Sequence, residues 1–240
     1  MADFVYHAAG ATAIFENNPF ERRFRDMHTA VSSAQAHGAK IGGRSVGTFG
    51  TASFSFYPTK NMTTTEGGMV LTNDDAIAER LRMIRHQGMS TQYLHEVVGY
   101  NFRMTDPSAA IGLVQLKRLP GWQAKRNANA AYYDGALKSV RTPTVPAGRE
   151  HVYHQYTVRV REGVDRDAAL KRLNERGVGA RVYYPLPIHR QPVFAKRPEY
   201  QELALPETER ATREVISLPV HPLLTEEERA FVAAEVNATC

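Results

Sequence analysis

Cysteine is almost absent from this 240-residue sequence, and the single one, Cys240, stands at the last position. One cysteine excludes an intramolecular disulfide and a cysteine-based metal cage. No run approaches the roughly 18 consecutive apolar residues of a membrane-spanning helix. The first residues show no basic segment followed by an apolar one, so no signal peptide is expected. These absences favour a cytoplasmic protein.

A strong excess of charge of one sign is also missing. The chain has 30 Lys and Arg against 25 Asp and Glu, a net charge of +5, and the two signs are mixed along its length. A nucleic-acid-binding protein would be expected to show a basic stripe with exposed aromatic residues. We therefore expect an ordinary solvated surface and no nucleic acid, with at most a modest preference for an anionic small molecule. The 42% apolar content is typical of a soluble globular protein.

Residues 52–137 show an alternation of strand and helix patterns. Ala52–Tyr57 and Met69–Thr72 read as two strands. A helix capped by Asn73 is predicted to run to about Arg85, because its apolar residues recur at helical spacing at Ile77, Leu81 and Ile84.

A second helix is predicted over Pro107–Leu119, and Pro120 is expected to separate it from a third over residues 123–137. The buried side of the second helix is predicted to carry four apolar residues, Ala110, Leu113, Val114 and Leu116. Prolines and a glycine in Thr142–Gly148 suggest a linker.

Residues beyond this linker have a different pattern. Strands are predicted over Tyr156–Val160 and Val178–Tyr184, with a helix over Asp165–Arg176 between them. Thr225 and Glu228 have the spacing of a capping box for a last helix. We therefore expect the end of an α/β layer, a linking helix and a small α+β unit.

The densest group of chemically useful residues is Ser53–Asn61, followed by Glu66, Gly67 and Gly68. A lysine amine can form a Schiff base with a carbonyl, and pyridoxal phosphate (PLP) is the commonest cofactor of this kind. Lys60 stands just after a predicted strand, and Ser55, five residues earlier, could hydrogen-bond a phosphate. On spacing alone, a surface lysine in a turn is the more frequent meaning of such a pattern.

The segments around Lys60 resemble those of the DegT/DnrJ/EryC1/StrS family of sugar aminotransferases. Ser-Phe-Tyr-Pro-Thr-Lys-Asn and Thr-Glu-Gly-Gly-Met-Val are similar to the segment that carries the PLP lysine in that family. Further similar segments follow in the family's order, from residue 33 to residue 237. They are Ala34–Ala39, Gly99–Asp106, Ala109–Leu113, His151–Tyr156, Tyr184–His189 and Ser217–Pro222.

The resemblance implies an α/β fold of PLP fold type I, the aspartate-aminotransferase fold, and a dimer. It implies transfer of an amino group, usually from glutamate, to a keto group of a nucleotide-linked sugar. The expected division is a divergent or remnant segment over 1–32, a partial large PLP-binding domain over 33–119, a linking helix over 120–141 and a small domain over 142–240.

The resemblance also assigns roles to individual residues. Lys60 would anchor PLP and shuttle protons, and Ser55 would bind the PLP phosphate. Gln35 would contact the pyridoxal ring, and Asn101 would reach the phosphate of the cofactor in the neighbouring subunit. The residues expected near the sugar are His189, Tyr183 and Tyr184. No metal site is expected, because His151 and His154 lie in a strand-like pattern that points them to opposite faces.

Two departures from the family pattern bear on activity. The family aspartate that pairs with the pyridine nitrogen falls on Ser32, whose hydroxyl carries no charge. The family's first segment, with a Gly-Thr turn that binds phosphate and an aromatic residue that stacks on the ring, would lie before residue 1. The alternative to a catalyst is therefore a non-catalytic remnant or an assembly subunit. Either a homodimer or a complementary aminotransferase chain is expected as the partner.

Overall fold

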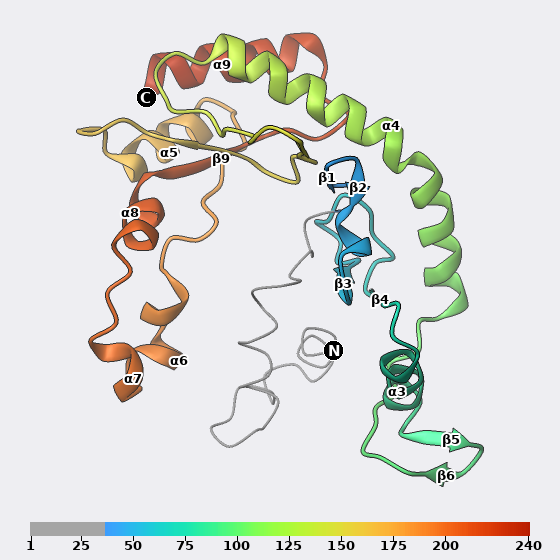
Figure 1. Cartoon of the computed structure of the whole chain (residues 1–240). Coiled ribbons are helices and arrows are strands. Elements are labelled where there is room, and N and C mark those ends of the chain that lie inside the picture. The colour runs from blue at the N-terminus through green and yellow to red at the C-terminus, as the bar shows by residue number, and fades with distance from the viewer. Residues whose placement is uncertain (1–36) are drawn as a thin grey trace. The chain divides into compact units, whose positions relative to one another are not determined.

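The computed structural model describes residues 37–240, which form two compact units. One unit comprises the residues up to Gln123 together with Pro146–Val152, and the other comprises Ala124–Val145 and Tyr153–Cys240. Figure 1 shows the elements of both units along the chain. The predictions made for Ser32, Gln35 and the segment 1–32 lie outside the described residues.

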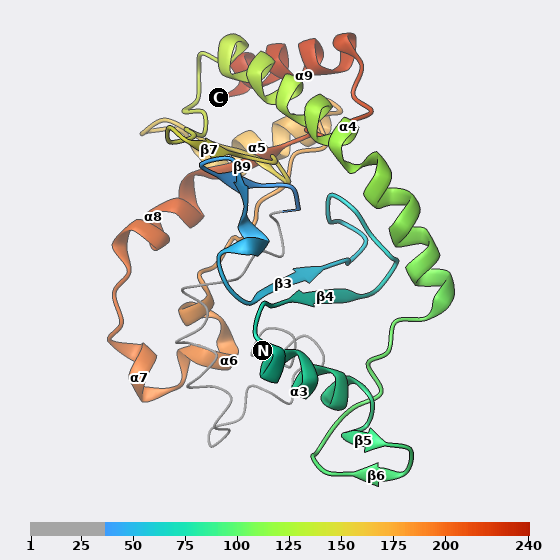
Figure 2. The same cartoon turned by 45° about the vertical axis from the view of Figure 1, so that its right-hand side comes forward.

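The two strands predicted on either side of Lys60 are confirmed as an antiparallel pair (Figure 2). Strand β3 (Ala52–Ser55) pairs with β4 (Gly68–Leu71), and the register sets Ser55 opposite Gly68. A second small sheet has the order β2–β1–β7, formed by β2 (Arg44–Ser45), β1 (Lys40–Ile41) and β7 (Arg149–Glu150). The short 3-10 helix η2 (Val46–Thr48) follows β2.

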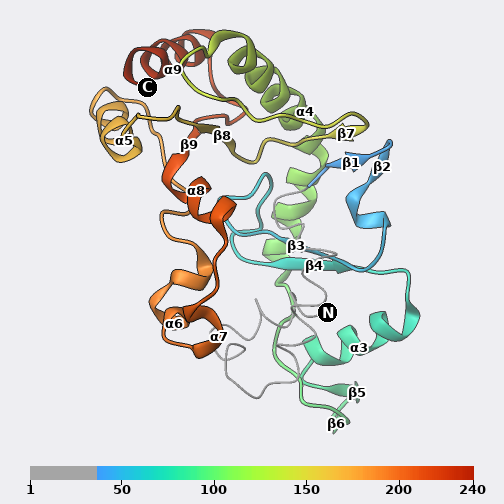
Figure 3. The same cartoon turned by 60° about the vertical axis from the view of Figure 1, so that its left-hand side comes forward.

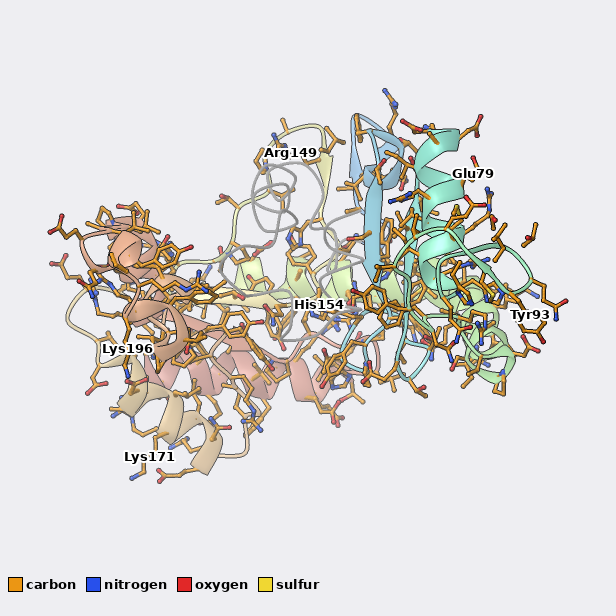
Figure 4. The ribbon with its side chains drawn as sticks, turned by 90° about the horizontal axis from the view of Figure 1, so that it is seen from below. Glu79, Tyr93, Arg149, His154, Lys171 and Lys196 are labelled. Atoms are coloured by element: carbon orange, nitrogen blue, oxygen red, sulfur yellow. The ribbon has the colours of Figure 1, made fainter. Side chains whose placement is uncertain are left out.

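Helix α3 (Asp75–Arg85) confirms the predicted helix after β4 but begins one residue later than expected. Its cap is Asp74, not Asn73, and the Asp74 carboxylate accepts a hydrogen bond of 3.0 Å from the backbone N–H of Ile77. The hairpin of β5 (Met89–Thr91) and β6 (Leu94–His95) follows it. Figure 4 labels Glu79 on α3 and Tyr93 in the turn between the strands, where its side chain is 82% exposed.

The prediction that Pro120 separates two helices is wrong. A single helix, α4, runs over Asp106–Ala136 with Pro120 inside it. A proline within a helix removes one backbone hydrogen bond and costs about 3 kcal/mol. Buried residues lie on both sides of it in sequence, with Leu119 in the core of the first unit and Tyr133 in the core of the second. Packing at both ends of the helix offsets that local cost.

The predicted buried side of α4 is also wrong. Gly112, Gln115 and Leu119 share one face, and Gly112 and Leu119 are buried. A Cβ at Gly112 would lie 2.9 Å from the Thr64 methyl group, so this glycine allows the helix to approach the Lys60 loop closely. The apolar residues chosen from the sequence lie on the other faces and are exposed: Ala110, Leu113, Val114 and Leu116.

The second unit has the larger described core, built on the antiparallel pair β8 (Tyr156–Arg159) and β9 (Val215–Leu218). Helices α5 (Arg166–Glu175) and α9 (Glu226–Thr239) confirm the predicted helices. The predicted capping box is also confirmed, because Thr225 and Glu228 exchange hydrogen bonds with each other's backbone N–H. The largest fully buried side chains of this unit are Tyr133, Tyr156, Leu173, Ile216, Val158, Val178 and Val236.

The strand predicted over Val178–Tyr184 does not form. Burial alternates at Val178 and Ala180, as in a strand, but only Arg181 makes a bridge, to Ser217 of β9. The chain then continues through the 3-10 helix η3 (Ile188–Arg190) and the helices α6 (Pro192–Ala195), α7 (Pro198–Gln201) and α8 (Pro206–Glu214) (Figure 3). Among the described residues, no helix combines the length and apolarity needed to cross a membrane.

Candidate functional site

Lys60 lies in a tight loop directly after β3. The Lys60 backbone N–H donates a hydrogen bond of 3.0 Å to the carbonyl of Tyr57, which closes a turn that includes Pro58. The Lys60 side chain is half-buried, and in the described part of the chain its amine has no carboxylate partner. Partial removal from water lowers the pKa of the Lys60 amine below its ordinary value. The fraction of uncharged, nucleophilic amine is therefore increased.

Glycines form the wall of this loop where side chains would not fit. Gly67 has φ +153°, and a Cβ there would lie 2.5 Å from the Thr64 hydroxyl. A Cβ at Gly68 would lie 3.0 Å from the carbonyl oxygen of Phe54. Thr64 is buried and donates a hydrogen bond of 2.8 Å to the carbonyl of Glu66. Glycine is therefore required at both positions, because neighbouring protein atoms already fill the space that a Cβ would take.

His37 is a buried imidazole close enough to Lys60 for the two charges to interact. It is 5% exposed, and its ring stacks on Phe56 with centroids 5.6 Å apart. Neither ring nitrogen has a hydrogen-bond partner among residues 37–240. Burial, reinforced by the positive charge of Lys60, lowers the pKa of His37 to about 4. The imidazole is therefore neutral at pH 7 and retains unused hydrogen-bonding capacity.

Ser55 ends β3, five residues before Lys60. The Ser55 hydroxyl oxygen accepts a hydrogen bond of 3.3 Å from the backbone N–H of Tyr57. This contact fixes the hydroxyl at the start of the loop and leaves its proton available for an anionic acceptor. Ser55 therefore lies at the end of β3 and Lys60 in the loop that follows it, while Gly67 and Gly68 lie where the chain enters β4.

Asn101 lies in a different part of the same unit. Its segment is hydrogen-bonded to the end of α3, where the backbone N–H of Tyr100 donates to Ile84 and that of Phe102 donates to Arg85. Asn101 forms a backbone bridge with His86 and has an exposed side chain. Within the described residues, no hydrogen bond joins Asn101 to Lys60 or Ser55. The arrangement presents Asn101 to the surroundings rather than to the lysine loop.

A pocket of about 770 Å³ lies beside the start of this segment. It contains none of the residues predicted to contact the cofactor or the sugar. The Arg103 guanidinium donates a hydrogen bond of 2.7 Å to Nδ1 of His86 at its edge. Its lining residues, of both charge signs, are Asp75, Glu79, Arg82, Met83, Arg85, His86, Met89, Ser90 and Arg103.

The predicted sugar-contacting residues belong to the second unit. His189 is 6% exposed, and its Nε2 lies 3.1 Å from the carboxylate of Glu209. Arg190 also pairs with Glu209, at 3.3 Å. The hydrogen bond from His189, with help from Arg190, lowers the pKa of Glu209. Tyr183 and Tyr184 are 46% and 63% exposed.

Sequence reasoning missed several residues that support these sites. Asn61 is buried beside Lys60, and Thr64 is buried behind Gly67. Glu209 stands 20 residues from its partner His189. Spacing alone does not show these contacts, because each depends on how separate segments fold together. Among the described residues, no group of three or more His, Cys, Asp or Glu side chains is arranged to hold a metal ion.

A family model described as the DegT/DnrJ/EryC1/StrS aminotransferase family matches residues 28–237. The pleiotropic regulatory protein of Geobacillus stearothermophilus is 44% identical over 211 residues, covering 85% of this chain and 56% of that protein. The dTDP-3-amino-3,4,6-trideoxy-alpha-D-glucose transaminase of Streptomyces venezuelae is 37% identical over 203 residues, covering 82% and 52%. The chain thus spans about half the length of the curated relatives it matches.

Two solved structures also match most of this chain. The crystal structure of S. venezuelae DesV in complex with a ketimine intermediate matches with a TM-score of 0.81 and 35% identity, covering 93% of this chain and 62% of that one. The PLP form of the sugar aminotransferase Spr1654 from Streptococcus pneumoniae matches with a TM-score of 0.74 and 25% identity, covering 87% and 57%.

Proposed function

The chain belongs to the DegT/DnrJ/EryC1/StrS aminotransferase family and has the α/β fold of PLP type I enzymes, and from that premise we propose that it transfers an amino group to a keto group of a nucleotide-linked sugar. Glutamate is the proposed donor. The similar relative from S. venezuelae is named as a transaminase of a dTDP-linked amino sugar, which supports a nucleotide-linked substrate. The observation that carries the proposal is the half-buried amine of Lys60, which lies in the loop after β3.

The residues present fit pyridoxal 5'-phosphate. Lys60 offers a half-buried amine of lowered pKa without a carboxylate partner in the described chain. The buried His37 has unused polar atoms in the same neighbourhood. When bound through a lysine, PLP supplies an electron sink for proton loss next to the transferred nitrogen.

Lys60 has two tasks in this proposal. Its uncharged Nζ is the nucleophile that holds the cofactor, and burial, by lowering the pKa of the amine, increases the fraction in this form. The same nitrogen then accepts and returns a proton during transfer. Because His37 is neutral, it adds no positive charge that would oppose protonation of Lys60.

We assign the remaining roles by family resemblance. Ser55 and Gln35 are the proposed contacts to the cofactor phosphate and ring, and Asn101 would reach the cofactor of a neighbouring chain. The exposed position of Asn101 is compatible with such a contact. The proposed sugar contacts are His189, Tyr183 and Tyr184. The proposed partner is a second copy or a complementary aminotransferase chain.

We also retain as a proposal the division into a cofactor domain over 33–119, a linking segment over 120–141 and a small domain over 142–240, with the boundary at residue 120 lying inside α4 and not at the start of a separate helix. The cytoplasm remains the proposed compartment.

Visible absorption spectroscopy of the purified chain mixed with pyridoxal 5'-phosphate tests the proposed function. Wild type is expected to develop a visible band, which glutamate removes as 2-oxoglutarate appears, and Lys60→Ala is expected to show neither change. Adding a nucleotide-linked keto-sugar should restore the band and yield the amino sugar. A wild-type chain with no band at saturating cofactor would contradict the proposal and favour a non-catalytic assembly subunit.

A further inference from the structure

Asn61, the residue after Lys60, is anchored to a distant part of the chain. It is 7% exposed, and its side-chain Nδ2 donates a hydrogen bond of 3.2 Å to the backbone carbonyl of Val152, 91 residues away. A buried amide that joins two segments in this way restricts both of them, because breaking the bond would leave a buried carbonyl without its donor.

Other hydrogen bonds fix parts of the loop that are farther along the chain from Lys60. The Thr63 backbone N–H donates a hydrogen bond of 2.8 Å to the side-chain oxygen of Gln115 on α4. The Thr63 hydroxyl donates to the carbonyl of Phe56 at 2.8 Å, and the Thr64 N–H donates to the same carbonyl at 3.1 Å. These contacts fix residues three and four positions after Lys60. Asn61 is therefore the side-chain anchor next to Lys60 itself.

The segment that receives the Asn61 bond is itself fixed. Val152 is 3% exposed, and the following residue, Tyr153, has φ +40° and is also buried. The guanidinium of Arg126 donates a hydrogen bond of 3.0 Å to the Tyr153 carbonyl and one of 3.5 Å to that of His154. Here the chain leaves the first unit and enters the second. Asn61 and Val152 both belong to the first unit, and the burial of Val152 holds its carbonyl in place there.

We propose that Asn61 is a positioning residue for Lys60, which acts through its hydrogen bond to the Val152 carbonyl. The proposal rests on the function assigned to Lys60 above. A lysine side chain rotates about several bonds, so the region that its amine can reach is set by the position of the backbone from which the side chain leaves. Displacement of a reacting group by about 1 Å can cost on the order of 100-fold in rate. Fixing the backbone beside Lys60 limits such displacement.

The test uses four forms of the full chain: wild type, Asn61→Leu, Asn61→Ser and Thr51→Val. Leucine keeps the branched shape of asparagine but cannot donate, whereas serine keeps a donor on a shorter side chain. Thr51→Val is the matched control, because it removes a side-chain hydrogen bond of 2.9 Å, from Thr51 to Thr72, that lies outside the lysine loop. Each form is measured with saturating pyridoxal 5'-phosphate by visible circular dichroism and by the fraction of Lys60 fixed by borohydride.

We expect Asn61→Leu to lose at least about fivefold in both signals, because the cofactor is held in several orientations. Asn61→Ser should recover part of the loss. The control, Thr51→Val, should keep both signals even if its melting temperature falls as far as that of Asn61→Leu. Equal signals in Asn61→Leu and wild type would overturn the inference. A purely structural role would lower the melting temperature and leave both saturated signals unchanged.

A second measurement separates failure of this inference from failure of the proposed function. Acetylation of Lys60 by acetic anhydride, relative to that of the exposed Lys117, is followed in the chain without cofactor. Asn61→Leu should change the labelling of Lys60 relative to Lys117 at least about threefold, because a loosened loop alters both the exposure of the amine to the reagent and the fraction of it that is uncharged. An unchanged ratio would overturn the positioning role, whether or not wild type binds pyridoxal phosphate.

Discussion

The ring of His37 lies at 25° to the ring of Phe56, with centroids 5.6 Å apart, and a second ring, that of Phe54, lies 5.4 Å away. Two aromatic neighbours and 5% exposure keep this imidazole out of water. An imidazolium would lose its hydration in such a place, so the neutral form is favoured. The packing of His37 against Phe54 and Phe56 therefore keeps a neutral imidazole near the Lys60 amine.

Replacing His37 should change how stability depends on pH. The pKa of His37 is lowered from 6.5 to about 4 in the folded chain. As the pH falls from about 6.5 towards 4, the unfolded chain therefore binds a proton before the folded chain does, and the stability of wild type decreases. Between pH 6.5 and pH 5 the free energy of unfolding of wild type should fall, and we expect His37→Phe to remove up to about 2 kcal/mol of that fall. Urea unfolding at both pH values measures it. Identical pH dependence in the two proteins would show that His37 is not buried as described.

Gly67→Ala should destabilise the lysine loop. Its new Cβ would lie 2.5 Å from the Thr64 hydroxyl and 3.1 Å from the Met104 methyl group, and the backbone has φ +153°. We expect a loss of about 1–3 kcal/mol in the free energy of unfolding. Gly121→Ala is the matched control, because that glycine lies within α4 with nothing near its missing Cβ. The control should gain up to about 1 kcal/mol, so equal effects of the two changes would refute the loop geometry.

Tyr156→Phe tests the core of the second unit. Tyr156 is fully buried, and its hydroxyl donates a hydrogen bond of 2.5 Å to the Asp134 carboxylate. Burial and this carboxylate together raise the pKa of the Tyr156 phenol, so it remains a donor at all ordinary pH values. Removing the hydroxyl should cost about 1.5–3 kcal/mol, the usual range for a hydrogen bond to a charged group. Thermal unfolding measures the loss, which should shrink greatly in an Asp134→Asn background.

Ser32→Asp tests the departure from the family pattern at the pyridine nitrogen. If this residue faces the cofactor nitrogen, a carboxylate should add a charge-assisted hydrogen bond worth about 1.5–3 kcal/mol, or roughly a tenfold or greater gain in affinity for pyridoxal phosphate. Fluorescence titration measures the affinity, with Ser33→Asp as the control one position away. A gain shared by both variants would reflect net charge and would contradict the assignment of Ser32.

Local sequence patterns predicted the elements that are stabilised locally. The β3 and β4 strands, the capping box of α9 and the helices α3 and α5 follow from alternation, caps and helical spacing. Asp74 caps α3 in place of the adjacent Asn73 because either side chain can accept from the first-turn N–H groups. The grouping of Ser55 and Lys60 was also predictable, because both belong to one strand and the loop that follows it.

Features that depend on distant partners were not predictable in the same way. Helix α4 continues through Pro120 because Leu119 and Tyr133 are buried in different cores, which no local pattern reveals. Its inward face is set by Gly112 against Thr64, whereas the apolar residues Leu113 and Leu116 face outward. The bond from Asn61 to Val152 joins residues 91 positions apart. Tertiary contact, rather than spacing, decides each of these.

Borohydride reduction of the chain with pyridoxal 5'-phosphate, followed by peptide mass spectrometry, tests the central claim that Lys60 anchors the cofactor. The chain offers internal comparisons, because Lys40 forms an ion pair of 3.1 Å with Glu150 and Lys117 is exposed on α4. We expect the reduced cofactor on the peptide that carries Lys60, at close to one per chain, and its loss in Lys60→Ala. Equal labelling of Lys40 or Lys117, or labelling that persists in Lys60→Ala, would contradict the account.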